Sequence, residues 1–174
     1  IDISSVTDTE ILVNLHEVLE KKDVPLKLSG MYAYMIYDKK NNQVTIARDI
    51  QGEKSLYIFE DENEILISSE ISSIMKYRKK LILRNDILSN YFNTRHFMIN
   101  NETVFQDIRQ LEPGSVETLD LENLQWNRLS KRSISEFIDP QRYFENEKRS
   151  VNSLTDELDA LLIKSVKEMT PKKH

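Results

Sequence analysis

The sequence predicts an α+β fold, in which helices frame a body of antiparallel strands and a linker leads to a final amphipathic helix. Four short apolar segments follow one another between residues 30 and 69, with only turns between them. Parallel strands need long crossover connections, so segments this close in sequence are expected to pair antiparallel. Apolar residues recur at helical spacing before these segments and again near the end of the chain.

The first helix is predicted over residues 8–22. Thr7 and Glu10 have the spacing of a capping box, in which a Thr caps the helix and a Glu follows three residues later. Lys21 and Lys22 stand at the end, where the helix dipole favours cations. The apolar positions between them define one stripe along the helix: Ile11, Leu12, Leu15, Val18 and Leu19.

The strands are predicted next. Residues 30–38 are almost wholly apolar and aromatic, which is typical of a central strand covered on both faces. Residues 44–49 are its expected hairpin partner, and a second hairpin is expected from residues 55–60 and 64–69. Further along, the pattern predicts helices over residues 71–77 and 85–93 and short strands over residues 103–105 and 114–121.

The C-terminal part reads as a linker and a helix. Residues 130–150 are polar, contain Pro140, and are predicted to be irregular. A last helix is expected to be capped at Ser153 and to end at Pro171. Its apolar stripe has no further segment of this chain to pack on, so it is expected to dock on another domain: Leu158, Leu161, Leu162, Val166 and Met169.

Composition excludes several functions. The net charge is -5 with basic residues scattered among acids, so no nucleic-acid surface is expected. No apolar run approaches the roughly 18–20 residues of a membrane-spanning helix. The chain has no cysteine, which excludes a disulfide, a thiolate metal site and a cysteine nucleophile within it, and its three histidines show no metal-ligand spacing. No secretory signal is apparent, so the expected location is cytoplasmic.

A few polar residues stand out as candidates. Asp8 lies in the first turn of the predicted helix, where it either complements the helix dipole or binds a substrate ammonium group; the residues alone favour the first reading. Arg48 and Asp49 end a strand and open a loop that contains Gly52, and an ion pair that pins this loop is the simpler interpretation. Glu70 ends another strand, where it caps or pairs.

Taken together, six segments resemble, in order and spacing, the glutaminase domain of glutamine-hydrolysing asparagine synthetases, which are class II glutamine amidotransferases. Residues 7–10 resemble that family's Ser-Asp-x-Glu step, and residues 28–38 its Leu-x-Gly-Met-Phe-Ala-Phe-x-Ile-Tyr-Asp strand. The later segments are similar to its Ala-Arg-Asp loop, its Ala-Ser-Glu-Ile step, its Thr-Ile-Phe segment and its Leu-x-Pro-Gly turn: residues 47–57, 68–71, 103–105 and 111–114.

The resemblance implies a fold and a set of domains. It implies part of an N-terminal nucleophile hydrolase-type αββα sandwich with two antiparallel sheets. Residues 1–129 would be a partial glutaminase domain and residues 130–150 a linker. Residues 151–174 would be the first helix of an ATP-dependent synthetase domain, and that domain, which lies outside this chain, would use ATP and Mg²⁺.

The resemblance also implies an activity. A processed N-terminal Cys would attack the side-chain amide of glutamine, and the released ammonia would amidate aspartate that ATP has activated. Asp8 matches the carboxylate that holds the α-amino group of glutamine, while Arg48, Asp49, Gly52 and Glu70 match structural residues near the site. The family's nucleophile lies upstream of these motifs, so this chain is expected to be inactive alone, with no catalytic residue and no metal ligand of its own.

Two departures from the family keep alternatives open. Gln51 stands where the family prefers Leu, and Ser55 stands where it prefers Pro. A related scaffold domain that no longer releases ammonia, as in β-lactam synthetases and lasso-peptide cyclases, is one alternative, and a truncated, non-catalytic interaction domain is another. The expected partners are glutamine and either the synthetase domain or the rest of the glutaminase domain, and a homodimer is left open.

Overall fold

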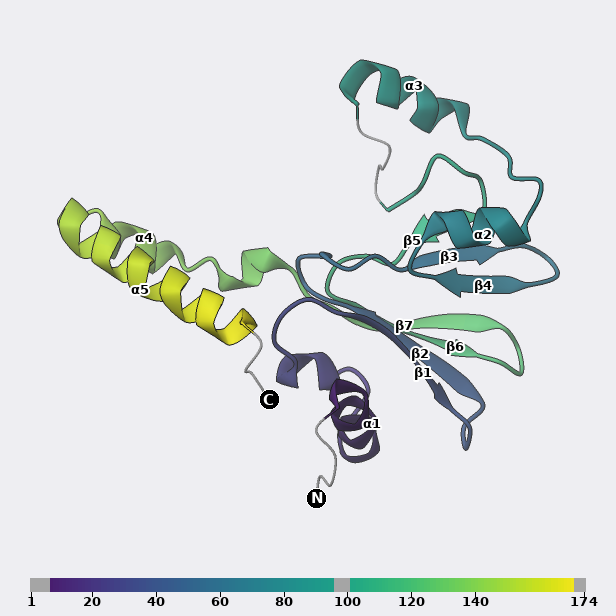
Figure 1. Ribbon diagram of the computed structural model, residues 1–174, viewed down its shortest axis with the longest axis horizontal. Coiled ribbons are helices and arrows are strands. Elements are labelled where there is room, and N and C mark those ends of the chain that lie inside the picture. The colour runs from purple at the N-terminus through teal and green to yellow at the C-terminus, as the bar shows by residue number, and fades with distance from the viewer. Residues whose placement is uncertain (1–6, 96–100, 171–174) are drawn as a thin grey trace. The chain divides into compact units, whose positions relative to one another are not determined.

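The computed structural model describes residues 7–95 and 101–170, and the chain divides into two compact units, residues 1–133 and 134–174. The first unit contains two antiparallel sheets with helices beside them (Figure 1). The four-stranded sheet has the order β1-β2-β6-β7, and the three-stranded sheet has the order β4-β3-β5. The predicted α+β class with antiparallel sheets is therefore confirmed.

The strand bounds are as follows. The four-stranded sheet contains β1 (Ala33–Asp38), β2 (Gln43–Arg48), β6 (Ser115–Asp120) and β7 (Gln125–Lys131). The three-stranded sheet contains β3 (Tyr57–Glu60), β4 (Ile65–Ser68) and β5 (Ile108–Gln110). The β1–β2 and β3–β4 hairpins confirm the two that the sequence predicts.

The core takes apolar side chains from both sheets. Its main cluster is buried: Val44, Ile46, Leu56, Ile58, Leu111 and Leu119. A second cluster joins Phe59 on β3 and Ile108 on β5 to Ile74 of helix α2 (Ile71–Tyr77). Burial of these side chains is the main force that holds the unit together, because each removes apolar surface from water.

Four helical segments of the described chain accompany the sheets. Helix α1 (Asp8–Val18) begins at the predicted cap, where the Thr7 hydroxyl accepts the N–H of Glu10 at 3.4 Å. It ends at Val18 rather than residue 22, because Leu19 adopts an extended conformation. A short 3-10 turn, η1 (Val24–Lys27), follows, and its Val24 is fully buried. Helices α2 and α3 (Asn85–Thr94) confirm the two that the pattern predicts.

Strand β1 corrects one prediction. It begins at Ala33, and within the part of the chain that the structure describes it is an edge strand rather than a central one. Met35 and Tyr37 are 55% and 53% exposed, so the strand is not covered on both faces. An apolar run predicts that side chains prefer burial, but it carries no information on how many backbone edges are paired.

A second prediction, of a strand over residues 103–105, was wrong. The Thr103 hydroxyl donates to the Ile108 carbonyl at 2.8 Å and accepts the N–H of Phe105 at 3.2 Å, which folds the segment into a turn. The strand begins instead at Ile108, as β5. A threonine side chain that bonds nearby backbone competes with regular strand pairing.

The second unit is helical. It contains η2 (Ile134–Phe137), α4 (Pro140–Asn146) and α5 (Val151–Met169). Residues 130–150 are therefore not irregular: Asp139 accepts the N–H of Gln141 at 2.9 Å and caps α4, and Pro140 occupies the first turn, where its missing N–H costs nothing. The domain boundaries taken from the resemblance stay a prediction.

Helix α5 begins earlier than predicted. Ser150, not Ser153, is the cap, and its hydroxyl accepts the N–H of Ser153 at 3.2 Å. Glu157 binds Arg142 and Arg149, which joins α4 to α5.

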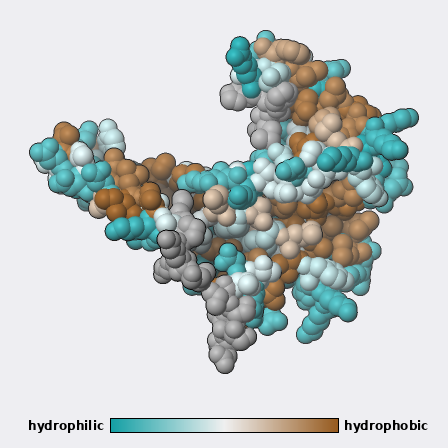
Figure 2. Space-filling view, in the orientation of Figure 1, coloured by the Kyte–Doolittle hydropathy of each residue, from teal (hydrophilic) through white to brown (hydrophobic). Residues whose placement is uncertain are grey.

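Figure 2 shows apolar side chains on this unit, and four residues of the predicted stripe are more than half exposed: Leu158, Leu161, Leu162 and Val166. In the described ranges, no helix has the length and apolar character that crossing a membrane requires.

Candidate functional site

A cavity of about 600 Å³ opens where three segments of the first unit meet. The start of β1, the end of the loop after β2, and the turn between β4 and α2 supply its walls. This volume lies in the range of pockets that hold small molecules. The lining residues are Met31, Tyr32, Ala33, Lys54, Ser55, Leu56, Ser69 and Glu70.

Arg48 organises the loop that leads to this cavity. Its guanidinium donates to the carbonyls of Lys54 at 2.6 Å, Gly52 at 2.5 Å and Leu111 at 2.6 Å. The residue is only 5% exposed, and this burial lowers the pKa of the guanidinium, although the neighbouring Asp49 carboxylate opposes the change. The side chain therefore acts as a buried cross-link between the loop and the Leu111 backbone.

Asp49 holds the same loop from inside. Its carboxylate accepts the N–H groups of Gln51 at 3.1 Å, Glu53 at 3.0 Å and Lys54 at 3.1 Å. Burial works to raise the pKa of this carboxyl, but the N–H donors outweigh it and hold the pKa below its ordinary value. Together with Arg48, this carboxylate fixes the loop through backbone contacts rather than through the simple ion pair that the sequence suggested.

Gly52 occupies a position in the loop where a residue with a Cβ atom would be strained. Its φ is +69°, and a Cβ there would lie 2.8 Å from Pro113 Cγ and 2.9 Å from Arg48 Cζ. Gly114, across the loop, has the same φ and donates its N–H to the Asp49 carbonyl at 2.9 Å. Two glycines thus let the turn after β2 approach the turn before β6.

Glu70 lies at the rim of the cavity and is exposed. It precedes α2 as the cap residue, and its carboxylate accepts the Ser72 hydroxyl at 2.8 Å. Its own N–H donates to the Ser68 hydroxyl at 3.2 Å. The structure therefore brings Glu70 and the loop held by Arg48 and Asp49 to one cavity.

Asp8 is placed differently. It is exposed, opens α1, and is not among the cavity-lining residues. Helix α1 approaches β1 through His16, whose Nε2 lies 3.2 Å from the Tyr34 hydroxyl. Tyr34 stands two residues from Tyr32 on the cavity wall. A glutamine contact for Asp8, and the nearness of the loop residues to glutamine, stay predictions.

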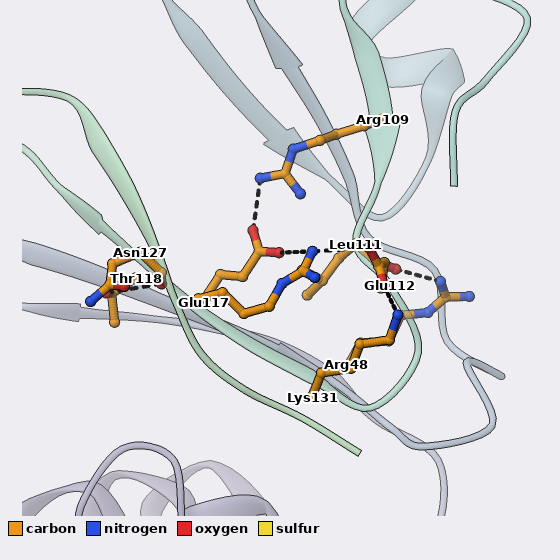
Figure 3. A network of polar contacts seen from close by, with 9 residues as sticks. Arg48, Arg109, Leu111, Glu112, Glu117, Thr118, Asn127 and Lys131 are labelled. Carbon is orange, nitrogen blue, oxygen red and sulfur yellow. Dashed lines mark hydrogen bonds and ion pairs between the residues drawn. The ribbon is translucent and has the colours of Figure 1, made fainter. Parts of the chain in front are cut away.

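A charged network joins the two sheets, and the sequence analysis did not predict it. Glu117 on β6, only 4% exposed, accepts from Arg109 on β5 at 2.8 Å and from Arg128 on β7 at 3.4 Å (Figure 3). Glu112 binds Arg128 and Lys131. These partners come from different segments of the chain, so no pattern within one helix or strand could have found them.

Trp126 completes this inter-sheet contact. The Arg109 guanidinium lies 5.0 Å from the centre of the indole, at a cation–π distance, and the indole N–H donates to Glu60 on β3 at 3.0 Å. The network thus joins β6 and β7 of one sheet to β3 and β5 of the other. Its contacts are all internal to the unit, which identifies it as a structural feature.

Comparison with known proteins gives the family. A family model described as a glutamine amidotransferase domain matches residues 1–130. The chain is 30% identical over 119 residues to a Methanocaldococcus jannaschii protein whose name proposes it as asparagine synthetase (glutamine-hydrolyzing) 2, and the match covers 67% of this chain and 23% of that protein. It is 28% identical over 113 residues to asparagine synthetase (glutamine-hydrolyzing) 1 of Bacillus subtilis, which covers 65% of this chain and 18% of that protein.

Among solved structures, the chain is similar to glutamine phosphoribosylpyrophosphate amidotransferase from B. subtilis, with 19% sequence identity and a TM-score of 0.48. That similarity covers 75% of this chain and 25% of the other. The chain spans less than a quarter of the length of the two asparagine synthetase relatives named above. Since the family model covers most of the sequence, the chain belongs to the class II glutamine amidotransferase family and is distantly related to the glutamine-hydrolysing asparagine synthetases.

Proposed function

We propose that this chain contributes the glutamine-binding part of a glutamine-dependent asparagine synthetase. In this proposal, glutamine is hydrolysed to glutamate and ammonia, and the ammonia amidates aspartate in an ATP-dependent domain. The family match over residues 1–130 and the names of the relatives support the reaction class. The observation that carries the residue assignment is Asp8, an exposed carboxylate at the first position of a capped helix, within the motif that matches the family.

The proposed role of Asp8 is to accept hydrogen bonds from the α-ammonium group of glutamine. A carboxylate and an ammonium form a charge-assisted hydrogen bond, which is roughly twice as strong as a neutral one. The positive end of the helix dipole favours the ionised carboxylate at this position. Among the described residues, no side chain forms an ion pair or hydrogen bond with the Asp8 carboxylate, and its exposure leaves it accessible to a ligand.

The nucleophile of this reaction is not one of the 174 residues, because the chain contains no cysteine. A cysteine thiolate would attack the side-chain carbonyl carbon of glutamine, ammonia would leave, and water would cleave the resulting thioester. ATP and Mg²⁺ would act in the synthetase domain, where they activate the aspartate carboxylate. Arg48, Asp49 and Gly52 would fix the wall of the cavity, and Glu70 would lie at its rim.

The test is Asp8→Asn in the complete protein, with asparagine formation measured from glutamine and, separately, from ammonium salts. We expect a KM for glutamine raised about 10-fold or more, since the lost contact is a charge-assisted hydrogen bond worth roughly 1.5–3 kcal/mol. Ammonia-dependent synthesis should be unchanged. Glu17→Gln, which also removes an exposed acid from α1, is the matched control and should change neither activity. Equal loss of both activities in Asp8→Asn would remove Asp8 from the glutamine site.

A second candidate is a scaffold domain of an amide-forming enzyme that uses no glutamine. The observation that favours it is Ser55, which replaces the proline expected from the resemblance and lines the cavity, where its hydroxyl accepts from Gln110 at 3.3 Å. The same assay separates the two functions. Glutamine that supports no synthesis, while ammonia or an intramolecular amine does, would establish the scaffold.

A further inference from the structure

Helix α1 is held against the four-stranded sheet by a polar contact. Every described residue of α1 keeps some exposure, so the helix has no fully buried apolar anchor of its own. His16 faces Tyr34 of β1: the imidazole Nε2 lies 3.2 Å from the phenol oxygen, and the rings meet edge to face with centres 5.5 Å apart. The position of α1 on the sheet, called its seat below, therefore depends on an ionisable side chain.

The contact continues to the cavity. The rings of Tyr34 and Tyr32 lie 5.9 Å apart, and Tyr32 is part of the cavity wall. The Tyr32 carbonyl accepts the N–H of Asp49 at 2.9 Å, which ties this tyrosine to the loop after β2. Side chains in contact thus lead from α1, which carries Asp8, through two tyrosines to the cavity.

The charges around His16 favour its neutral form. Burial is the largest effect that lowers the pKa of this imidazole, and the ammonium of Lys21 adds to it, while the Asp38 carboxylate works in the opposite direction. Lys21 itself lies 3.4 Å from Asp38 and donates to Gln43, so its charge is held in place beside the contact.

The tyrosines present no compensating charge. Burial raises the pKa of Tyr34, and the neighbouring Tyr32 raises it further, so its phenol stays neutral. The pKa of Tyr32 is also raised, first by burial and then by Asp49, although Arg132 opposes the change. A proton added to His16 would therefore place a second cation beside Lys21 in a half-buried contact, where Asp38 at the end of β1 supplies the opposing negative charge.

We propose that His16 is a positioning residue, which in its neutral form seats α1 on Tyr34 and so aligns Asp8 with the cavity for glutamine. Protonation of His16 in mild acid weakens this seat, and glutamine binding becomes weaker while the ammonia-dependent reaction does not change. The inference rests on the proposed function, since glutamine is its ligand. Glutamine use then depends on pH through a residue that acts by positioning α1.

The experiment measures KM and kcat for glutamine in the complete protein between about pH 8 and pH 5.5, the range over which an imidazole titrates. His16→Gln keeps a polar partner for the Tyr34 hydroxyl but cannot titrate. We expect the wild-type KM to rise in acid, by at most about tenfold per pH unit because one proton is involved. The Gln variant should match the wild-type KM near pH 8 and lack the component of the acid rise due to His16. The ratio of the two KM values is therefore the readout.

Two further measurements keep the test decisive. Tyr34→Phe, which keeps the ring and removes the hydroxyl, should raise KM at all pH values and leave kcat unchanged. The imidazole of His16 can be titrated by NMR in the protein itself, and in Tyr34→Phe its pKa should change, because a direct neighbour is altered. A KM ratio that stays constant with pH, in an enzyme that does use glutamine, would overturn the proposal. An enzyme that uses no glutamine at any pH would instead overturn the proposed function.

Discussion

Replacement of Arg48 by Met tests how the loop beside the cavity is held. Met keeps much of the apolar stem but removes all three guanidinium hydrogen bonds. The carbonyl of Leu111 is the critical acceptor, because that residue is fully buried and water cannot replace the lost donor. The carbonyls of Gly52 and Lys54 lie in a loop that is partly open to solvent, where water can substitute.

These differences set the expected magnitude. An unsatisfied buried carbonyl costs about 1–3 kcal/mol, and each of the two hydrated ones is expected to cost roughly 0.5–1 kcal/mol. Removal of a buried charge returns part of this, since burial disfavours the ionised guanidinium. The net loss of unfolding free energy should therefore be about 1–4 kcal/mol, with the first unit destabilised and the second unaffected.

Urea denaturation followed by Trp126 fluorescence measures this directly. Trp126 is the single tryptophan of the chain and belongs to the first unit, so the transition reports on that unit alone. Arg84→Met is the matched control, because Arg84 pairs on the surface with Asp86 and Glu102 and should shift the midpoint little. A loss below about 1 kcal/mol in Arg48→Met would refute the reasoning, because it would mean that the Leu111 carbonyl finds another donor.

Two other predictions concern a turn and a carboxylate. Gly114→Ala should destabilise the first unit far more than Gly30→Ala, although both glycines have positive φ. A Cβ at Gly114 would lie 2.2 Å from the Arg132 carbonyl oxygen, whereas a Cβ at Gly30 would meet open space. Thermal unfolding of both variants measures the difference, and equal losses of stability would contradict the prediction. Hydrogen bonds from Asn41 lower the pKa of Asp38 to about 2, so Asp38 adds stability above its ordinary pKa of 3.8 that is lost as pH falls toward 2. The stability deficit of Asp38→Asn, measured by urea titration at each pH, should therefore be constant above about pH 5 and shrink below it.

Local patterns predicted the elements whose contacts are local. The capped helix α1 and the two hairpins follow from spacing and alternation within short windows, so the sequence contained what was needed. Strand β7 was missed because most of its side chains are exposed or half-exposed and polar, which leaves no apolar alternation to detect. Helix α4 was missed because Pro140 was taken as a breaker, although proline is favourable in the first turn of a helix.

The site shows the same division. The sequence singled out Arg48, Asp49 and Gly52, and these three do lie together in one loop, because they are neighbours in the chain. The acceptor of Arg48 at Leu111 could not be predicted, since it comes from a segment far along the sequence. The contact of His16 with Tyr34 was equally hidden, because helix and strand periodicities say which side chains are buried but not which side chain each one meets.

The division of β5 and β6 between the two sheets has a consequence for folding kinetics. These strands are consecutive, yet β5 pairs with β3, bringing residue 109 to residue 58, and β6 pairs with β2, bringing residue 117 to residue 46. The hairpins β1–β2, β3–β4 and β6–β7 can form early, because the strands of each are close in sequence. Each sheet, however, gains its non-local strand from the same short segment. We therefore expect the docking of residues 108–120 to be the slow step in the folding of the first unit. During synthesis on the ribosome, neither sheet can be completed before that segment has left the exit tunnel.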